Sequence, residues 1–263
     1  MELGKMHSRL RLDLAMFSPW IAKERIDIYL YANPVSYVQG EFSPPEWSNG
    51  IALYARKLIV SHEQPEIAKM HSVLAHEMSH LLFEGYWAEK KQNPPVWLNE
   101  GLAMMEEAPD PAKPESSDWH RAMWVLADGN VIPLRKFFSL SPTKDMGKAD
   151  KDSVSYWYVQ AYSIVYFLYR EHTRLQFRNF CTLLREGKTL KEALWKAYRY
   201  PSMEKFSQQW QAWLNKPELR AKIKPRAAAV AASAPVPKGA GGKPGLRNVG
   251  FKNFQFHRLI PED

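Results

Sequence analysis

The chain is organised around one stretch, Ala68-Lys-Met-His-Ser-Val-Leu-Ala-His-Glu-Met-Ser-His-Leu-Leu-Phe83. It contains neither Pro nor Gly, and its apolar residues recur close to the helical period at Met70, Val73, Leu74, Met78, Leu81 and Leu82. The pattern predicts a helix over residues 66–83, which Glu84-Gly85 is expected to end.

Two histidines of this helix are four residues apart, in the order His76-Glu77-Met78-Ser79-His80. Side chains at i and i+4 lie on one helical face, so a single metal ion can bind both imidazoles. Glu77 is rotated by one position, where it can reach a water molecule beside the metal rather than the metal itself. A surface helix that carries two histidines by chance is the alternative. The apolar flanks argue against it, because burying two imidazoles and a carboxylate is costly unless an ion such as zinc satisfies them.

A third ligand is expected from the next helix. Val96-Trp-Leu-Asn-Glu-Gly-Leu-Ala103 follows Pro94-Pro95, which is typical of a helix start. Catalytic zinc takes three protein ligands and leaves a fourth position open. Glu100, twenty positions after His80, is the natural third ligand, because a short loop lets an antiparallel helix present it.

These two motifs, in this order, resemble the gluzincin metallopeptidases. The stretch Trp97-Leu98-Asn99-Glu100-Gly101 is similar to the aminopeptidase branch of that clan, and the resemblance covers roughly residues 20–215. It implies an α+β, zincin-like fold. A small N-terminal mixed sheet is expected to pack on the H-E-x-x-H helix, followed by a mainly helical C-terminal subdomain.

The resemblance also implies a mechanism. His76, His80 and Glu100 are expected to hold one Zn²⁺ per chain, which lowers the pKa of its bound water toward neutrality. Glu77 then acts as general base while the water attacks a peptide carbonyl. The sequence therefore predicts a zinc metallopeptidase, a hydrolase acting on a peptide or protein substrate.

A tyrosine is the expected hydrogen-bond donor to the oxyanion of the tetrahedral intermediate. The segment 158–168 resembles the Tyr-x-Gln…Phe-Leu pattern of small uncharacterised peptidase-like gluzincins, and on that match Tyr158 is the donor. Tyr156 and Tyr162 are the alternatives. In the other interpretation, all three pack as core aromatics.

Residues 9–60 are predicted to form strands and turns. Arg25–Tyr31 alternates apolar and polar residues in its first half, and Ile51–Val60 is either one long strand or a strand pair. In gluzincins an edge strand precedes the zinc helix and lies along the cleft. By resemblance, Gly50–Ala55 binds an extended peptide by strand addition; the alternative is an ordinary strand without substrate contact.

The second helix is predicted over residues 96–107. Glu106 and Glu107 lie six and seven positions after Glu100 and are expected to be solvated. Thermolysin-like enzymes often place an acidic residue four positions after the glutamate ligand, where it orients a ligand histidine. That position is Met104 here, so no such partner is predicted.

The domain is expected to span residues 1–220, with the sheet and zinc helices in 9–107 and a helical part in 115–220. Thr189-Leu-Lys-Glu192 is a capping box that starts one of these helices. Residues 221–250 form a basic, low-complexity Ala/Pro/Gly linker that is predicted to be disordered, and residues 251–263 form a short apolar tail.

Composition limits the function classes. The 263 residues are 45% hydrophobic, which is enough for one sizeable core. No apolar run reaches the ~18 residues of a membrane span. The first ten residues lack the apolar region of a signal peptide, so export requires an upstream signal and the compartment stays open.

Two other functions remain as alternatives. The net charge of +8 suits an anionic polymer or nucleic acid, although no nucleic-acid-binding motif is present. The second is a catalytically silent, zinc-binding scaffold, against which the intact general base Glu77 argues. Cleavage preference and oligomeric state are not predicted.

Overall fold

The computed structural model describes residues 3–17, 25–46, 48–110, 112–140 and 151–223. The predicted tail lies outside the described residues. So does the predicted linker, apart from its first three residues, which belong to the helix α13, Pro217–Ile223.

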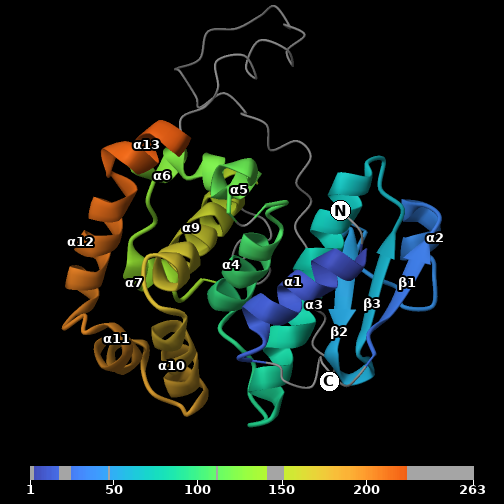
Figure 1. The fold of residues 1–263 in the computed structure, drawn as a ribbon, viewed down its shortest axis with the longest axis horizontal. Coiled ribbons are helices and arrows are strands. Elements are labelled where there is room, and N and C mark those ends of the chain that lie inside the picture. Colours follow the sequence, from blue (N-terminus) through green and yellow to red (C-terminus); the bar gives the residue numbers. More distant parts are fainter. Residues whose placement is uncertain (1–2, 18–24, 47, 111, 141–150, 224–263) are drawn as a thin grey trace, which may run out of the picture.

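A three-stranded sheet lies at one end of the molecule (Figure 1). β3 (Leu58–His62) is the central strand, with β1 (Asp27–Tyr31) parallel to it on one side and β2 (Gly50–Leu53) antiparallel on the other. The predicted strand at 25–31 is confirmed. The region 51–60 is a strand pair, interrupted by a 3₁₀ turn at Tyr54–Arg56.

The first residues form a helix, α1 (Leu3–Leu14), so the prediction of strands from residue 9 was wrong there. Met6, Leu10 and Leu14 are buried, four residues apart, and this spacing gives one apolar stripe along a helix. α1 packs against α3 (Ile67–Ala88), the helix that carries the two histidines (Figure 1).

The helix α3 continues through Gly85, where the sequence predicted its end. Its last turn is held by α10 (Arg174–Arg185). The Arg185 guanidinium lies 3.6 Å from the centre of the Tyr86 ring and donates to the Tyr86 carbonyl oxygen at 2.6 Å. An interior glycine costs a helix about 1 kcal/mol. Burying an aromatic side chain stabilises the folded state by about 1.5–3 kcal/mol, so the packing of Tyr86 and Trp87 outweighs the cost of Gly85.

The second predicted helix is confirmed as α4 (Val96–Glu106), which packs between α3 and α9 (Lys151–Arg170). Gly101 makes the contact with α9 close. A Cβ atom at this position would lie 2.5 Å from Cγ2 of Val165 and 2.6 Å from the carbonyl oxygen of Ala161. Any larger residue would push α4, and Glu100 with it, away from α9.

Further helices complete the other end of the molecule (Figure 1). They are α5 (Asp118–Ala122), α6 (Trp124–Ala127), α7 (Leu134–Phe137), α10, α11 (Leu190–Tyr198), α12 (Met203–Leu214) and α13; a short helix α2 (Pro34–Val38) lies by the sheet. The capping box of Thr189 and Glu192 is present.

The arrangement is α+β, as expected: mostly helical, with one small mixed sheet. One large core fills the space between the helices, and a smaller one beneath the sheet contains Tyr37, Ile51 and Val60. Within the described ranges, no helix combines the length and the apolarity that crossing a membrane requires.

Candidate metal centre

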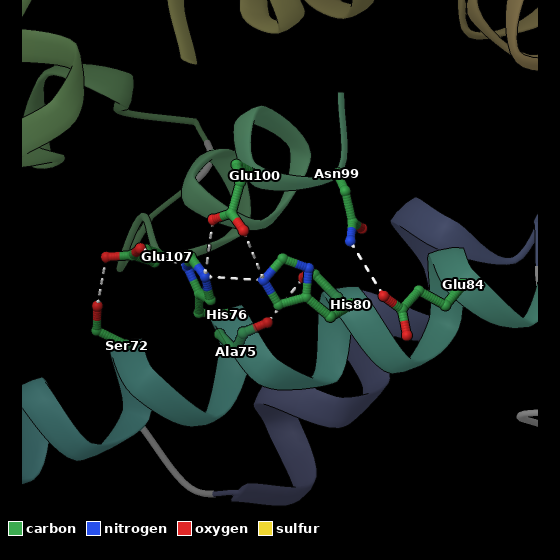
Figure 2. A network of polar contacts seen from close by, with 9 residues as sticks. Ser72, Ala75, His76, His80, Glu84, Asn99, Glu100 and Glu107 are labelled. Carbon is green, nitrogen blue, oxygen red and sulfur yellow. Dashed lines mark hydrogen bonds and ion pairs between the residues drawn. The ribbon is translucent and has the colours of Figure 1, made fainter. Parts of the chain in front are cut away.

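The structure brings His76 and His80 of α3 together with Glu100 of α4 (Figure 2). The two Nε2 atoms lie 3.0 Å apart. The Glu100 carboxylate oxygens lie 3.7 Å from Nε2 of His76 and 3.9 Å from Nε2 of His80. One ligand atom from each residue falls within 4.8 Å of the other two. A single metal ion can therefore contact all three side chains.

The far nitrogen of the His76 ring fixes its tautomer. Nδ1 lies 2.7 Å from Oε1 of Glu107, and a carboxylate can only accept, so this nitrogen carries the proton. The Nε2 atom of His76, which faces His80, is then unprotonated and presents its lone pair. A ligand histidine is commonly oriented in this way by a carboxylate on its other nitrogen.

His80 has an amide in the corresponding place. The Asn99 Nδ2 atom donates to Oε1 of Glu84 at 3.2 Å (Figure 2), and Asn99 partly opposes the lowering of the His80 pKa by burial. The Nε2 atoms of the two rings lie 3.0 Å apart, close enough for one cation to contact both.

The electrostatics of the site suit a cation. Burial lowers the pKa of His76 to about 3 and lowers that of His80 well below its usual value, so both imidazoles are in the neutral, metal-binding form. Burial, followed by the charges of neighbouring carboxylates, raises the pKa of Glu77 and of Glu100. A divalent cation would stabilise these buried acids in their ionised forms. The residues present thus fit a zinc ion with two nitrogen ligands and one oxygen ligand.

Glu77 lies next to the candidate ligands and against the sheet. Its side chain is fully buried, and a Cβ atom on Gly50 of β2 would lie 2.8 Å from Glu77 Cγ. Only a glycine lets the edge strand come this close to the carboxylate-bearing side chain. The predicted peptide-binding stretch Gly50–Ala55 is a strand as far as Leu53 and turns into the 3₁₀ segment beyond it.

The prediction that Glu106 and Glu107 are solvated was wrong. Glu106 is 1% exposed and the Glu107 side chain 8% exposed. Glu107 also accepts a hydrogen bond from Ser72 Oγ at 3.0 Å, so it bridges two residues of α3 (Figure 2). Glu107 orients His76, the role expected of an acidic residue at the position that Met104 occupies. The signal was in the sequence, because seven residues are almost two full helical turns and place Glu107 on the face of Glu100.

Tyr158 lies on α9, buried beside Trp157 and Trp119 with ring centres 5.1 and 6.5 Å away. Burial raises its pKa, and the charge of Glu100 raises it further. The alternative Tyr162 points its hydroxyl to Nδ1 of His120, 3.4 Å away. Of these two tyrosines, it is Tyr158 whose pKa responds to the charge of Glu100, a member of the candidate metal site.

Comparison with protein families places this architecture in a known class. The model described as "Peptidase MA superfamily" matches residues 13–216, and the chain belongs to this superfamily. Comparisons with curated proteins and with solved structures gave no significant match. The superfamily suggests a metallopeptidase function, and the group His76, His80 and Glu100 is capable of binding a metal ion.

Proposed function

We propose that this chain is a zinc metallopeptidase with a zincin-like arrangement of sheet and helices, in which His76, His80 and Glu100 hold one zinc ion. The observation that carries the proposal is the pair of Nε2 atoms 3.0 Å apart, with the Glu100 carboxylate beside them. Two imidazoles and one carboxylate leave the open coordination position that a catalytic zinc site requires.

Zinc bound there would polarise a substrate carbonyl and lower the pKa of a water molecule. The protein's own groups supply the rest. Glu77, adjacent to a ligand and buried, takes the proton from the attacking water and passes it to the leaving amine. Tyr158 donates a hydrogen bond to the developing oxyanion, a role supported by its burial near Glu100.

The substrate in this proposal is a peptide that lies extended along β2. That strand is at the edge of the sheet, and Gly50 brings its backbone against Glu77. An edge strand can pair with an added strand through main-chain hydrogen bonds, which fixes a peptide bond in place without requiring a particular side chain.

The proposal is tested by metal analysis and cleavage of an unfolded protein, with wild type beside Glu77→Gln and Glu100→Ala. The glutamine variant has the same shape as the wild-type residue and lacks only the basic carboxylate. Expected are about one zinc per chain in wild type and in Glu77→Gln, cleavage only by wild type, and weakened zinc binding in Glu100→Ala.

Two results would contradict the proposal in different ways. A folded wild type that takes up no zinc, even when supplied with it, removes the metal site. Full zinc occupancy without cleavage of a broad mixture of peptides indicates the alternative function, a zinc-binding scaffold that has lost peptidase activity.

A further inference from the structure

Arg9, in the first helix, contacts the backbone on both sides of Glu107, the residue that orients His76. Arg9 Nη2 donates to the carbonyl oxygen of Glu106 at 2.6 Å, and its Nη1 donates to the carbonyl oxygen of Ala108 at 2.7 Å. The residue between these two carbonyls is Glu107. A side chain from α1 therefore fixes the backbone on both sides of the group that holds the metal-site histidine.

The chemistry of a helix end explains the contact. The last carbonyls of α4, which ends at Glu106, have no partner within the helix. A guanidinium group presents several N–H donors in a rigid plane and is favoured at the negative end of the helix dipole. A lysine in its place would offer one ammonium point charge and could not hold two carbonyls in fixed directions.

The fixed backbone determines where the Glu107 carboxylate lies. One oxygen is 2.7 Å from Nδ1 of His76 and the other accepts from Ser72 at 3.0 Å. Partners of this kind change the metal affinity of a site by about 10- to 100-fold when removed. α1 itself is anchored by its buried residues Met6 and Leu10, so Arg9 extends from a packed support.

We propose that Arg9 is a positioning residue of the metal site, through which the N-terminal helix sets the zinc affinity of His76. The inference rests on the proposed zinc site and goes beyond it. Arg9 lies before residue 13, where the match to the Peptidase MA superfamily begins. The support is therefore a feature of this chain outside the matched region.

The test is a double-mutant cycle on zinc affinity, measured by competition with a chromophoric chelator on protein shown to be folded by circular dichroism. The variants are Arg9→Ala, Glu107→Gln and the two combined. Arg11→Ala is the control, because Arg11 is an exposed arginine on the same helix. Glu107→Gln is expected to weaken zinc binding about 10- to 100-fold, and Arg9→Ala up to about 10-fold. In the combined variant, Arg9→Ala should add nothing to Glu107→Gln, since Arg9 acts through Glu107.

If Arg9→Ala does not fold, Arg9→Lys replaces it as the test variant and is expected to bind zinc more weakly than wild type. A merely structural Arg9 predicts lower stability with unchanged zinc affinity, or the same loss of affinity with and without Glu107. Either result overturns the inference and leaves the proposed function intact. Failure of wild type itself to bind zinc overturns both the inference and the proposed function. The control Arg11→Ala should match wild type in zinc affinity and stability.

Discussion

The Nε2 atoms of His76 and His80 lie 3.0 Å apart. On the other side of each ring, Nδ1 of His76 contacts the Glu107 carboxylate and His80 lies beside the Asn99 amide. This relationship requires more than two histidines four residues apart. Glu107, at the end of α4, sets the tautomer that turns the His76 lone pair toward His80, and Glu100 of α4 lies beside both rings. The candidate metal site is therefore a property of the α3–α4 pair rather than of α3 alone.

Removing zinc should destabilise the protein. A ligand present at about a thousand times its dissociation constant stabilises the folded state by ~4 kcal/mol, which corresponds to roughly 8–16 °C in Tm for a domain of this size. Differential scanning fluorimetry with a chelator, and then with excess zinc, measures the shift. His80→Ala should lose the shift, whereas His71→Ala, on the same helix but outside the cluster, should retain it. An equal response from both variants would contradict the assignment.

Tyr158→Phe removes only the hydroxyl proposed to reach the oxyanion. Loss of one such donor lowers kcat by about 10²–10³-fold, with KM and zinc content unchanged. Tyr162→Phe is the matched control, because its hydroxyl faces His120 instead, and its kcat should stay close to wild type. Steady-state kinetics on one cleaved peptide decides this. A small effect of Tyr158→Phe would mean that Tyr158 is a packing residue.

Gly101→Ala should destabilise the contact between α4 and α9. The new Cβ atom would lie 2.6 Å from a carbonyl oxygen of Ala161, which is backbone and moves little. Overpacking of this kind costs about 1–3 kcal/mol, and urea unfolding measures it. Gly4→Ala in α1 is the control: nothing lies within 4 Å of its added Cβ, so it should be neutral or stabilising. If Gly101→Ala leaves the free energy of unfolding unchanged, α4 and α9 can move apart without loss of stability.

The buried Glu106 should make stability depend on pH. Burial, and then the charge of Asp13, raises its pKa to about 7 from the ordinary 4.5. Because the folded state holds the proton more tightly, its stabilising contribution is present below pH 4.5 and is lost as the pH rises toward 7. The full difference amounts to about 3 kcal/mol.

Glu106→Gln removes this dependence while keeping the size of the side chain. Urea unfolding in the presence of a chelator should give similar stabilities for wild type and variant at pH 5, with the variant more stable at pH 8. The difference between the two proteins isolates Glu106 from the other buried carboxyl groups. Stability curves that stay parallel across this range would show that the Glu106 carboxyl does not titrate there.

The sequence by itself predicted the three side chains that the structure brings together as a group able to hold a metal ion. His76, His80 and Glu100 follow from local periodicity, because i and i+4 share a face in any helix, and from the motif that places a glutamate after the next helix start. Strand β1, helix α4 and the capping box at Thr189 were predictable for the same reason, since each depends on residues close in the chain.

Only the tertiary structure decided what surrounds those three residues. The burial of Glu107 and its contact with His76 depend on how α4 lies on α3, and the continuation of α3 past Gly85 depends on Arg185, a hundred residues away in the chain. Likewise, the role of Arg9 appears only when α1 meets the end of α4. Local propensity contributes about 1 kcal/mol per residue or less. The packing of residues distant in sequence contributes more per buried side chain, so it determines which acids are buried and which ligands they orient.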